Sequence, residues 1–511
     1  MPRTAGFVGG NVLTMGEVQN GSALFIEDGL VALVGRDEDV LACCAKAGVQ
    51  AIDLKGRTAV PGLHDCHVHM MGTGLNAQAI DLYDCKSVAD VLDKLKAADA
   101  VIPEDRWIFG KRLDESRLAE GCPPSMAELD SALSRRNVYI IDRGWHYTLV
   151  NRRAFDSLGI DRSMAGVCVN ADGVLNGRLH EDANATAKHA FFELQSIDAR
   201  REAFRYTSEY AAAKGVTTIH AMEGGSLFVD SDIRILLSMN DLPTHVTLYW
   251  PAAGVEDIKE KKLKQWGGDI LLDGSIGSRT AAFPEPYSDD PGNCGKLYYN
   301  EEQITSWIVD AHKNDVQIAF HAIGQSAVTQ ALDCLEAALK RYPVTDHRMR
   351  IEHFGFPTRG DILRAAKLGA VISTQPSFTY LRGGPGTVYN QRLGTKRERA
   401  AYPLRAFLDA GITVGGGSDS DVTPIDPLLG IHAAVNPPYG ENGVTALEAL
   451  KMFTIWAAAI AKEEKEKGSL EPGKLGDVTI LEKNPLEVEP TLIKDIGVWM
   501  TVKAGEITYS K

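Results

Sequence analysis

Three histidines crowd into six positions of the stretch "PGLHDCHVHMMG", residues 61–72. The first is His64, and His67 and His69 follow with Val68 between them. Residues two apart on a strand point to the same side, so His67 and His69 present two imidazoles to one face. At a strand end, two neutral imidazoles can bind a divalent metal ion if other segments complete the ligand set. By itself the pair is weak evidence, because buried histidines bonded to backbone groups are more common.

The other face of the same strand carries His64 and Cys66, whose parity is opposite to that of His67 and His69. We therefore expect His64 to face away from the metal and Cys66 to be a packed thiol. The chain has eight cysteines, and none of them forms a CxxC pair. This pattern favours reduced thiols in a cytoplasmic protein over a disulfide framework.

The elements that must position the histidines alternate along the chain. From about residue 205 onward, helical patterns lead into short apolar runs, as where "SWIVDAHKND" leads into "VQIAFHAIG". Such alternation predicts a parallel sheet. Adding "TAVPGLHDCHVH" and "NVYIIDRGWH" upstream, and "GGDILLDGS" between, gives about eight strands, which favours a closed (β/α)8 barrel of the α/β class.

Polar residues stand where a barrel of this kind places its chemistry, at the C-terminal ends of strands. Each of them ends or follows an apolar run. They are His67, His69, His146, His220, Asp269, Asp273, His321, His353, Gln375 and Asp419. The recurrence of such residues at successive strand ends favours a shared site over chance.

The two ends of the chain differ from the middle. Residues 1–60 and about 470–511 read as short strands, and "SALFIEDGLVALVG" has the Asp-Gly turn of a hairpin. We expect both ends to form one small β-sandwich domain, with the barrel at 61–469. The segment at about 75–205 is too long for one strand–helix unit, so we expect an insertion near the barrel mouth. It either covers a substrate or serves as scaffold or subunit contact.

Composition limits the classes of partner. The 511 residues carry a formal net charge of −14, which argues against a general nucleic-acid binder because phosphate contacts need clustered Lys and Arg. No run of about 18 apolar residues occurs, so we expect no transmembrane helix, and the N-terminus has no secretory pattern. We expect a small-molecule substrate, no membrane or nucleic-acid partner, and a homodimer.

Several stretches together resemble a known family. "VPGLHDCHVHMMG" resembles the first-strand signature of the amidohydrolase superfamily. The rest is similar to its YtcJ-like (amidohydrolase-3) branch, which includes N-substituted formamide deformylases. The matching stretches are "DGSIGSRTAAFPEPYSDDPGNCG" (273–295), "FHAIGQSAV" (320–328), "RIEHFG" (350–355), "STQPSF" (373–378), "GGGSDSDV" (415–422) and "KGSLEPGKLGDVTILEKNPL" (467–486). The resemblance implies a barrel flanked by a β-sandwich, and metal-dependent hydrolysis.

The resemblance also implies roles for particular residues. His67, His69, His321 and Asp419 are the implied metal ligands, and the metal is expected to be Zn²⁺. A bound Zn²⁺ lowers the pKa of its water to about 7. Asp419 can accept the proton of that water and pass it to the leaving amine. Either His353 or the metal would polarise the substrate carbonyl.

The fourth strand departs from the family pattern. Many relatives carry there a lysine that, once carboxylated, bridges two metals, whereas this chain has Asp269 in "GGDILLDGS". The aspartate side chain is several ångströms shorter, so it cannot take over the bridge unless the backbone moves inward. We therefore expect one divalent ion per chain, with Asp269 as an acceptor for a histidine N–H or a partner of the following loop.

Five residues are candidates for substrate binding. Arg279 and Ser275 lie in the Gly-rich loop "GSIGSRT", where an arginine can hold a carboxylate. Bracing of the loop by Arg279 through backbone carbonyls is an equally good interpretation. His146 and His220 follow apolar runs and can contact substrate or support other groups, and core packing stays an alternative for His220. Gln375 also follows an apolar run and is expected to contact substrate.

The resulting functional hypothesis is hydrolysis of a C–N bond in a small molecule, of the amide, N-acyl or N-formyl type. Deamination of a cyclic amidine would use the same water and base. A barrel of this type can also host a metal-dependent decarboxylase or isomerase, or serve as an interaction scaffold after losing activity. The fold alone does not choose among them.

Overall fold

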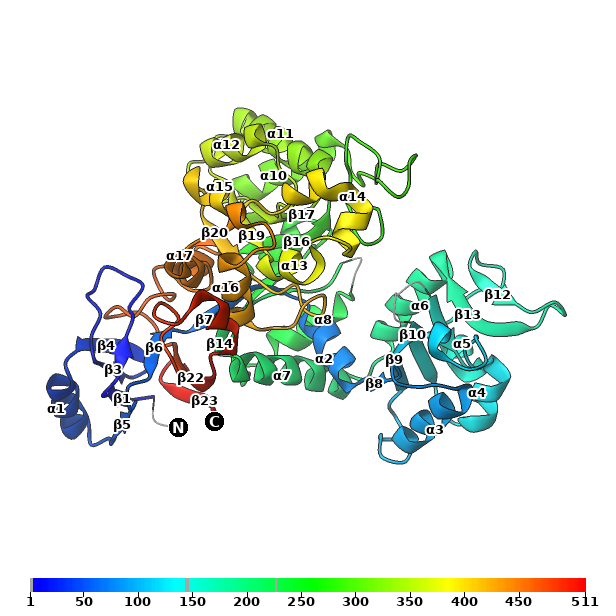
Figure 1. Ribbon diagram of the computed structural model, residues 1–511, viewed down its shortest axis with the longest axis horizontal. Coiled ribbons are helices and arrows are strands. Elements are labelled where there is room, and N and C mark those ends of the chain that lie inside the picture. The colour runs from blue at the N-terminus through cyan, green and yellow to red at the C-terminus, as the bar shows by residue number, and fades with distance from the viewer. Residues whose placement is uncertain (1–2, 143–146, 226–227) are drawn as a thin grey trace. The chain divides into compact units, whose positions relative to one another are not determined.

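The computed structural model describes residues 3–142, 147–225 and 228–511 (Figure 1). The chain divides into two compact units. The first comprises Met1–Met70, Thr207–Gly225 and Asp241–Lys511, and the second comprises Met71–Tyr206 and Ser226–Asn240.

Parallel strands of the first unit carry the predicted site residues. Within the described residues they form a three-stranded sheet, β15-β14-β7, and a five-stranded sheet, β16-β17-β18-β19-β20. Their bounds are β7 Leu63–Val68, β14 Val216–Met222, β15 His245–Tyr249, β16 Gln265–Leu271, β17 Gln317–Ala322, β18 Arg350–His353, β19 Val371–Thr374 and β20 Val414–Gly416. The two sheets are linked at both ends by isolated parallel bridges and not by a continuous ladder. Val68, after which β7 ends, pairs with Ser420 beyond β20, and Trp250 beyond β15 pairs with Trp266 of β16.

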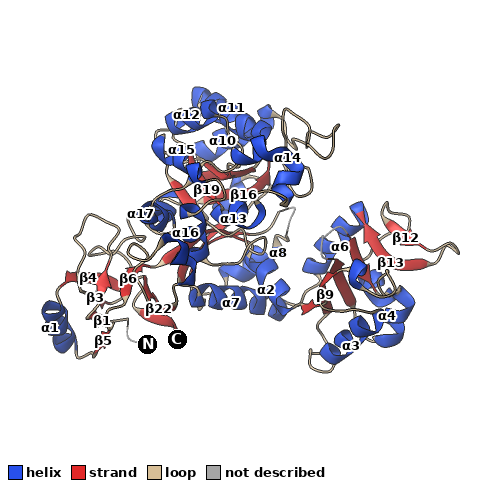
Figure 2. Cartoon of the chain, viewed as in Figure 1, coloured by secondary structure: helices blue, strands red, loops and turns tan. Residues whose placement is uncertain are grey.

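Helices alternate with these strands, as the sequence predicted (Figure 2). The helices are α7 Ile197–Ala213, α9 Val255–Glu260, α10 Glu301–Lys313, α11 Gln325–Arg341, α12 Arg359–Leu368, α13 Pro376–Arg382, α14 Val388–Arg399, α15 Leu404–Asp409, α16 Pro427–Val435, α17 Ala446–Met452 and α18 Ile455–Ile460. Local signals set their ends. For α12, Thr358 and Asp361 form a capping box, and Gly369 ends the helix with a left-handed φ of 76°. No helix in the described part of the chain is long and apolar enough to cross a membrane.

One strand assignment from the sequence is wrong. The run at 137–146 was expected to be a barrel strand, but β10 (Val138–Asp142) pairs with β9 (Ile108–Leu113) and β11 (Tyr147–Val150) in the second unit. In the first unit, β14 pairs with both β7 and β15. An apolar run signals a strand but not the sheet it joins, because pairing depends on distant segments.

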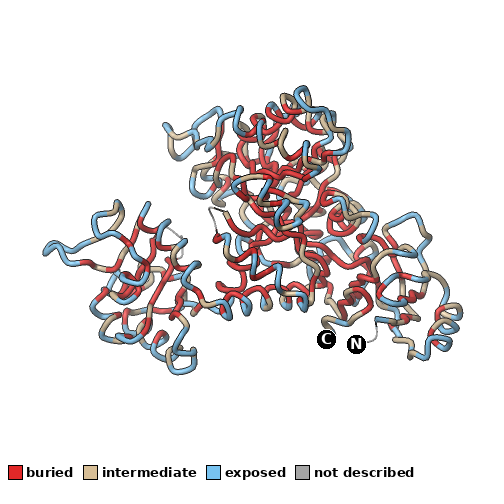
Figure 3. Tube along the Cα trace, turned by 180° about the vertical axis from the view of Figure 1, so that it is seen from behind, coloured by how far each residue is buried: buried red, intermediate tan, exposed pale blue. Residues whose placement is uncertain are grey.

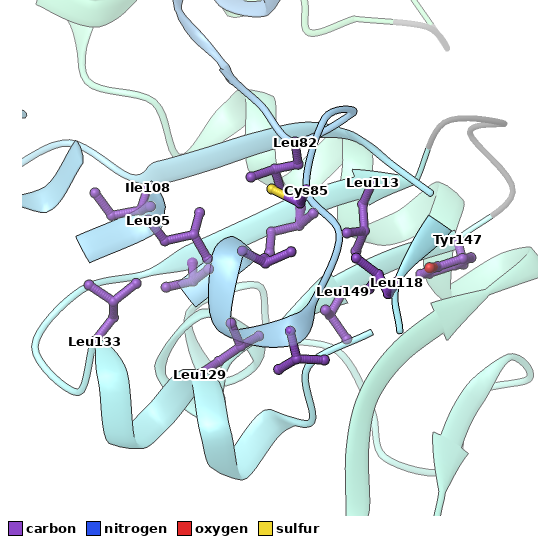
Figure 4. Packing of buried hydrophobic residues seen from close by; sticks show 14 residues of the cluster. Leu82, Cys85, Leu95, Ile108, Leu113, Leu118, Leu129, Leu133, Tyr147 and Leu149 are labelled. Carbon is purple, nitrogen blue, oxygen red and sulfur yellow. The ribbon is translucent and has the colours of Figure 1, made fainter. Parts of the chain in front are cut away.

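The second unit has its own mixed sheet and core. Its sheet has the order β12-β13-β11-β10-β9-β8, where β8 is Ile80–Asp81, β12 Val167–Val169 and β13 Leu175–His180. Strands β12 and β13 pair antiparallel. Helices of this part are α2 Met70–Gln78, α3 Val88–Asp99, α4 Met126–Ala132, α5 Arg152–Ser157, α6 Glu181–Glu193 and α8 Ser231–Leu237. Leucine and other apolar side chains point toward one another in its core (Figure 4).

Two further sheets of the first unit contain the strands of the chain ends, and the second of them joins strands from both ends. One has the order β4-β3-β1-β5 and the other β2-β6-β21-β22-β23. Their bounds are β1 Ala5–Val8, β2 Asn11–Val12, β3 Ala23–Glu27, β4 Leu30–Gly35, β5 Ala51–Asp53, β6 Thr58–Pro61, β21 Val478–Leu481, β22 Val498–Lys503 and β23 Glu506–Ser510, with α1 at Asp37–Ala47. Buried residues of both sheets, such as Phe7, Ile26, Val478 and Ile480, share one apolar cluster. Figure 3 shows by colour which segments of the chain are buried.

A variant that ends at residue 465 should be insoluble or unfolded. It would lose β21, β22 and β23, which leaves β6 without its antiparallel partner β21 and exposes the apolar cluster beneath. Solubility and circular dichroism would measure the effect, with a variant lacking only Lys511 as the control. A soluble, folded protein that ends at residue 465 would contradict the expectation.

Candidate metal centre

Five side chains of the first unit converge at strand ends. Within the part of the chain that the structure describes, two groups have ligand atoms close enough to share a metal ion. One is His67, His69 and Asp269, and the other is His67, His353 and Asp419. All five residues are buried.

The distances between these groups suit one small cation. His67 Nε2 lies 3.7 Å from Asp269 Oδ1 and 3.6 Å from Asp419 Oδ1. His69 Nε2 lies 3.1 Å from the same Asp419 oxygen. Four ligands at about 2.0–2.2 Å from a tetrahedral ion stand about 3.3–3.6 Å apart. The observed spacings scatter around that range.

Atoms of the cluster lack hydrogen-bond partners, which tests whether a metal fits. His67 Nε2, Asp269 Oδ2 and Asp419 Oδ1 are buried and form no hydrogen bond. Leaving buried polar atoms unsatisfied costs free energy, and such atoms call for a ligand. Imidazole nitrogen and carboxylate oxygen are a donor set that Zn²⁺ and similar divalent ions accept. The residues present therefore fit a divalent cation.

The histidine pair of the first strand behaves as its parity predicts. His67 lies in β7, and His69 follows the strand end. His69 Nδ1 lies 3.2 Å from the carbonyl oxygen of Met222, which leaves Nε2 toward Asp419. His64 instead packs edge-on against His220, with ring centroids 5.8 Å apart, and belongs to neither group.

Asp269 lies nearer the histidines than its side-chain length led us to expect. Its strand, β16, contains Gly267 and Gly268 with φ of 96° and 84°, and its register against β17 shifts between Gly267 and Leu271. A Cβ on Gly267 would stand 2.1 Å from the Ala319 carbonyl oxygen, so a side chain cannot replace it there. This bulge carries the backbone inward, the one condition under which the short side chain was expected to reach the site, and Asp269 accordingly lies with His67 and His69.

Left-handed backbone conformations aim two further groups. His353 has a φ of 69° and Asp419 a φ of 55°, both rare for residues with a side chain. His353 follows Glu352 directly, and consecutive strand residues normally face opposite sides. The turn at His353 nevertheless brings its ring to 5.0 Å from that of His67. The Asp419 amide donates to the His67 carbonyl at 2.8 Å, which ties the two segments together.

Gln375 and His321 flank this arrangement. Gln375 Oε1 lies 2.6 Å from His353 Nδ1, so this side chain supports a histidine, and its substrate contact stays a prediction. That bond has Nδ1–H as donor and leaves His353 Nε2 as an acceptor. His321 was expected to be a ligand but lies in neither group of the described residues. Its Nε2 is 3.3 Å from the Gly274 carbonyl oxygen, while its ring lies 4.4 Å from that of His353.

Carboxylates dominate the electrostatics of the centre. Burial lowers the pKa of His69, but Asp269 and Asp419 outweigh it and raise that pKa to about 10. The pKa of His67 is raised in the same way, against the effect of burial, by Asp419 and Asp269. For His353, burial and the neighbouring His321 hold the pKa well below its ordinary value. The pKa shifts thus favour the protonated form of His67 and His69 and the neutral form of His353.

The loop after β16 is held by internal contacts. Asp273 accepts hydrogen bonds from the amides of Ala282, Ile323 and Gly324, at 2.7 to 2.9 Å. Arg279 donates two hydrogen bonds to Asp289, at 3.1 and 2.9 Å, so a carboxylate stands where the bracing alternative expected backbone carbonyls.

The other predicted substrate contacts lie outside the metal groups. Ser275 is exposed, and its hydroxyl lies 2.8 Å from that of Ser278. His220 is fully buried and its Nδ1 lies 2.9 Å from Arg350 Nη1, which agrees with the packing alternative. His146 lies outside the described residues.

Sequence reasoning missed two charged residues beside the cluster. Arg350 and Glu352 both lie in β18 and are fully buried. The signal was present in "RIEHFG", where two opposite charges stand two apart on an otherwise apolar strand. Residues at that spacing share a face, and buried charges need partners.

Comparison with known proteins agrees with this architecture. The amidohydrolase family model matches residues 50–509. The chain is 27% identical to the putative amidohydrolase YtcJ of Bacillus subtilis (strain 168), covering 98% of this chain and 99% of that protein. It is 25% identical to the N-substituted formamide deformylase of Arthrobacter pascens, covering 96% and 95%.

A solved structure gives the same result for the fold. An uncharacterized metal-dependent hydrolase from Pyrococcus furiosus superposes with a TM-score of 0.83 at 27% identity, covering 95% of this chain and 100% of that one. The eight parallel strands and their alternating helices are thus those of a TIM barrel. The chain belongs to the amidohydrolase family and, within it, is YtcJ-like.

Proposed function

We propose that this protein is a metal-dependent hydrolase that cleaves a C–N bond of a small molecule, in an amide, N-acyl or N-formyl group. The observation that carries the proposal is the convergence of unsatisfied ligand atoms of His67, Asp269 and Asp419 at the strand ends. The similarity to a formamide deformylase supports the C–N bond, and the similarity to a metal-dependent hydrolase supports the metal.

The proposed ion is a single Zn²⁺ held by His67, His69, Asp269 and Asp419. His67 belongs to both candidate groups, but its Nδ1 is engaged by Glu352 at 2.9 Å. Only Nε2 is left for a metal, so His67 can serve one ion. A divalent ion in this place supplies Lewis acidity, which polarises a carbonyl and makes water a nucleophile near neutral pH.

The protein groups then perform the proton transfers. Asp419 accepts a proton from the attacking water and returns it to the leaving nitrogen, which departs as an amine. His353 Nε2, an acceptor while Nδ1 donates to Gln375, is placed to orient that water. This role replaces the expected polarisation of the carbonyl by His353, because a neutral ring with this partner has no N–H to offer. Substrate contacts of Arg279, Ser275, His146 and His220 stay predictions.

A substrate panel tests the reaction. The purified protein would be incubated with N-formyl, N-acyl, cyclic imide and cyclic amidine compounds, and the release of amine, acid and ammonia would be measured. Amine release that a chelator stops and Zn²⁺ restores would support the proposal. Ammonia release from amidines alone would favour the deaminase alternative. Loss of CO₂ or isomerisation of a compound would favour the decarboxylase or isomerase alternative.

Metal binding should weaken as the pH falls. Since Asp269 and Asp419 raise the pKa of His69 to about 10, against the effect of burial, this histidine holds a proton at neutral pH that a metal must displace. The affinity should fall about tenfold per pH unit for each proton displaced, between about pH 9 and 6. Competition with a chelator of known pH dependence would measure it, and an affinity that does not change with pH would contradict the proposed role of the histidines.

Elemental analysis should find close to one divalent ion per chain. The reason is the single available nitrogen of His67, which both candidate groups require. Mass spectrometry of the metal content, after removal of loosely bound ions, is the measurement. Two tightly held ions per chain would show that the one-ion proposal is mistaken.

We propose the domain organisation on the same basis. Residues 1–60 with 470–511 would form a β-sandwich domain, 61–469 the barrel, and about 75–205 an insertion. The pairing of β6 with β21 and the apolar cluster shared by the terminal sheets support the first part. The separate compact unit over Met71–Tyr206 supports the last. The homodimer and the cytoplasmic location stay predictions.

A further inference from the structure

A buried ion pair lies beside the candidate metal ligands. Arg350 Nε is 2.6 Å from Glu352 Oε1, and Arg350 Nη2 is 2.9 Å from Glu352 Oε2. Both side chains are fully buried. Removing two charges from water is costly, and a buried pair adds little net stability compared with apolar residues of similar size. The pair therefore invites a functional explanation.

The remaining contacts of Arg350 hold it in place. Its Nη1 lies 2.9 Å from His220 Nδ1, and its Nη2 also donates to the Cys66 carbonyl oxygen. The guanidinium stands over the ring of Tyr249, 4.3 Å from its centroid. These partners come from β7, β14 and β15, so three other strands fix the position of the arginine, which in turn fixes Glu352.

Glu352 also contacts His67, one of the proposed metal ligands. Its Oε2 accepts a hydrogen bond from His67 Nδ1 at 2.9 Å. An ionised carboxylate can only accept, so Nδ1 must carry the hydrogen. In that tautomer the lone pair of the neutral ring is on Nε2, the atom that faces Asp269 and Asp419 without a hydrogen bond.

We propose that Glu352, anchored by Arg350, is a positioning residue that keeps His67 in the tautomer and ring orientation that bind the metal. This inference rests on the proposed function, because it assumes that His67 is a ligand. Carboxylates that accept from metal-bound histidines raise ligand basicity, and losing one costs about 10–100-fold in metal affinity.

The test compares two variants by their metal affinity. In Glu352→Gln, an amide oxygen at the place of Oε2 would turn the amide NH₂, itself a donor, toward the cationic Arg350 Nε, and the reverse placement would leave His67 Nδ1 without an acceptor. The affinity for Zn²⁺ should therefore fall about 10–100-fold. The visible spectrum of the Co²⁺-loaded protein should change, because the His67 ring is no longer held. The double variant Arg350→Met with Glu352→Gln removes the unpaired buried charge and should recover thermal stability without recovering the affinity.

A matched control is Asp477→Asn. Asp477 is also a buried carboxylate bonded to a histidine, since its Oδ1 lies 3.2 Å from His245 Nε2, but it belongs to neither metal group of the described residues. This variant should keep the wild-type Zn²⁺ affinity. An equal loss of affinity in Asp477→Asn and Glu352→Gln would reduce the effect to general destabilisation and overturn the proposal.

The outcomes separate this inference from the proposed function. If wild-type protein binds Zn²⁺ and the variants of Glu352 bind it equally well, or if the double variant regains the affinity, the positioning role is wrong while the metal site stands. If wild type binds no divalent ion, the proposed function itself fails. Should the variants not fold, ¹⁵N-histidine spectra of Zn²⁺-loaded wild type, assigned with His67→Gln, still decide. A hydrogen on Nδ1 of His67 supports the proposal, and a hydrogen on Nε2 overturns it.

Discussion

Replacing His67 and His69 together with alanine should remove nearly all bound metal and nearly all turnover. The change deletes the two imidazoles that share the Asp419 oxygen, at 3.6 and 3.1 Å, and leaves only the two carboxylates of the proposed ligand set. The loss of turnover should well exceed the roughly 10–100-fold that removal of an outer partner of a metal ligand costs. Metal content by mass spectrometry and the rate of substrate cleavage would measure both effects.

His64→Ala provides the control for this experiment. His64 lies on the same strand and is also buried, but its ring faces His220 and not the carboxylates. Folded His64→Ala protein should therefore keep its metal. Wild-type metal content in the His67→Ala/His69→Ala protein would show that these histidines are not metal ligands.

Asp419→Asn should lower turnover by about 10²–10⁴-fold, the usual contribution of a general acid–base group, while most of the metal remains bound. Asparagine keeps a neutral oxygen that can still coordinate the ion, but it cannot take up the proton of the attacking water. Rates and metal content on the same preparation would separate the two roles. A parallel loss of metal and turnover would show that Asp419 acts mainly as a ligand.

Two comparison variants test whether the effect is specific to Asp419. Asp421→Asn changes an exposed carboxylate two residues away and should leave both quantities near wild type. Asp269→Asn should lower the metal content more than Asp419→Asn does, because Asp269 has no proposed part in proton transfer. Equal effects of Asp269→Asn and Asp419→Asn on both quantities would contradict the division of roles.

Much of the fold was predictable from local patterns. The strands and helices after residue 205 follow from hydrophobic periodicity, and the hairpin of β3 and β4 follows from its Asp-Gly turn. The strand at Val138–Asp142 was recognised but placed in the wrong sheet. Periodicity reports how a segment folds, whereas its sheet partners depend on contacts between segments far apart in the chain.

The candidate site divides in the same way. The spacing of His67 and His69 was sufficient to put both toward one cluster, since strand parity is a local property. Asp269 was predicted to be an acceptor for a histidine N–H or a partner of the following loop, because its side-chain length was considered without the bulge, although the two preceding glycines were a visible signal of one. Glu352 was overlooked because its partner, His67, lies 285 residues earlier in the chain.

By itself, the sequence determined the α/β class, the family and most of the residues that gather at the strand ends, because these follow from local periodicity and from motifs in a set order. Only the tertiary structure decided that Asp269 joins the histidines, that His321 lies beside the cluster and that Arg279 pairs with Asp289. It also decided which nitrogen of His67 is left for a metal. Each of these outcomes depends on where side chains of different strands and loops lie relative to one another. The backbone path and the packing determine those positions, and no local pattern encodes them.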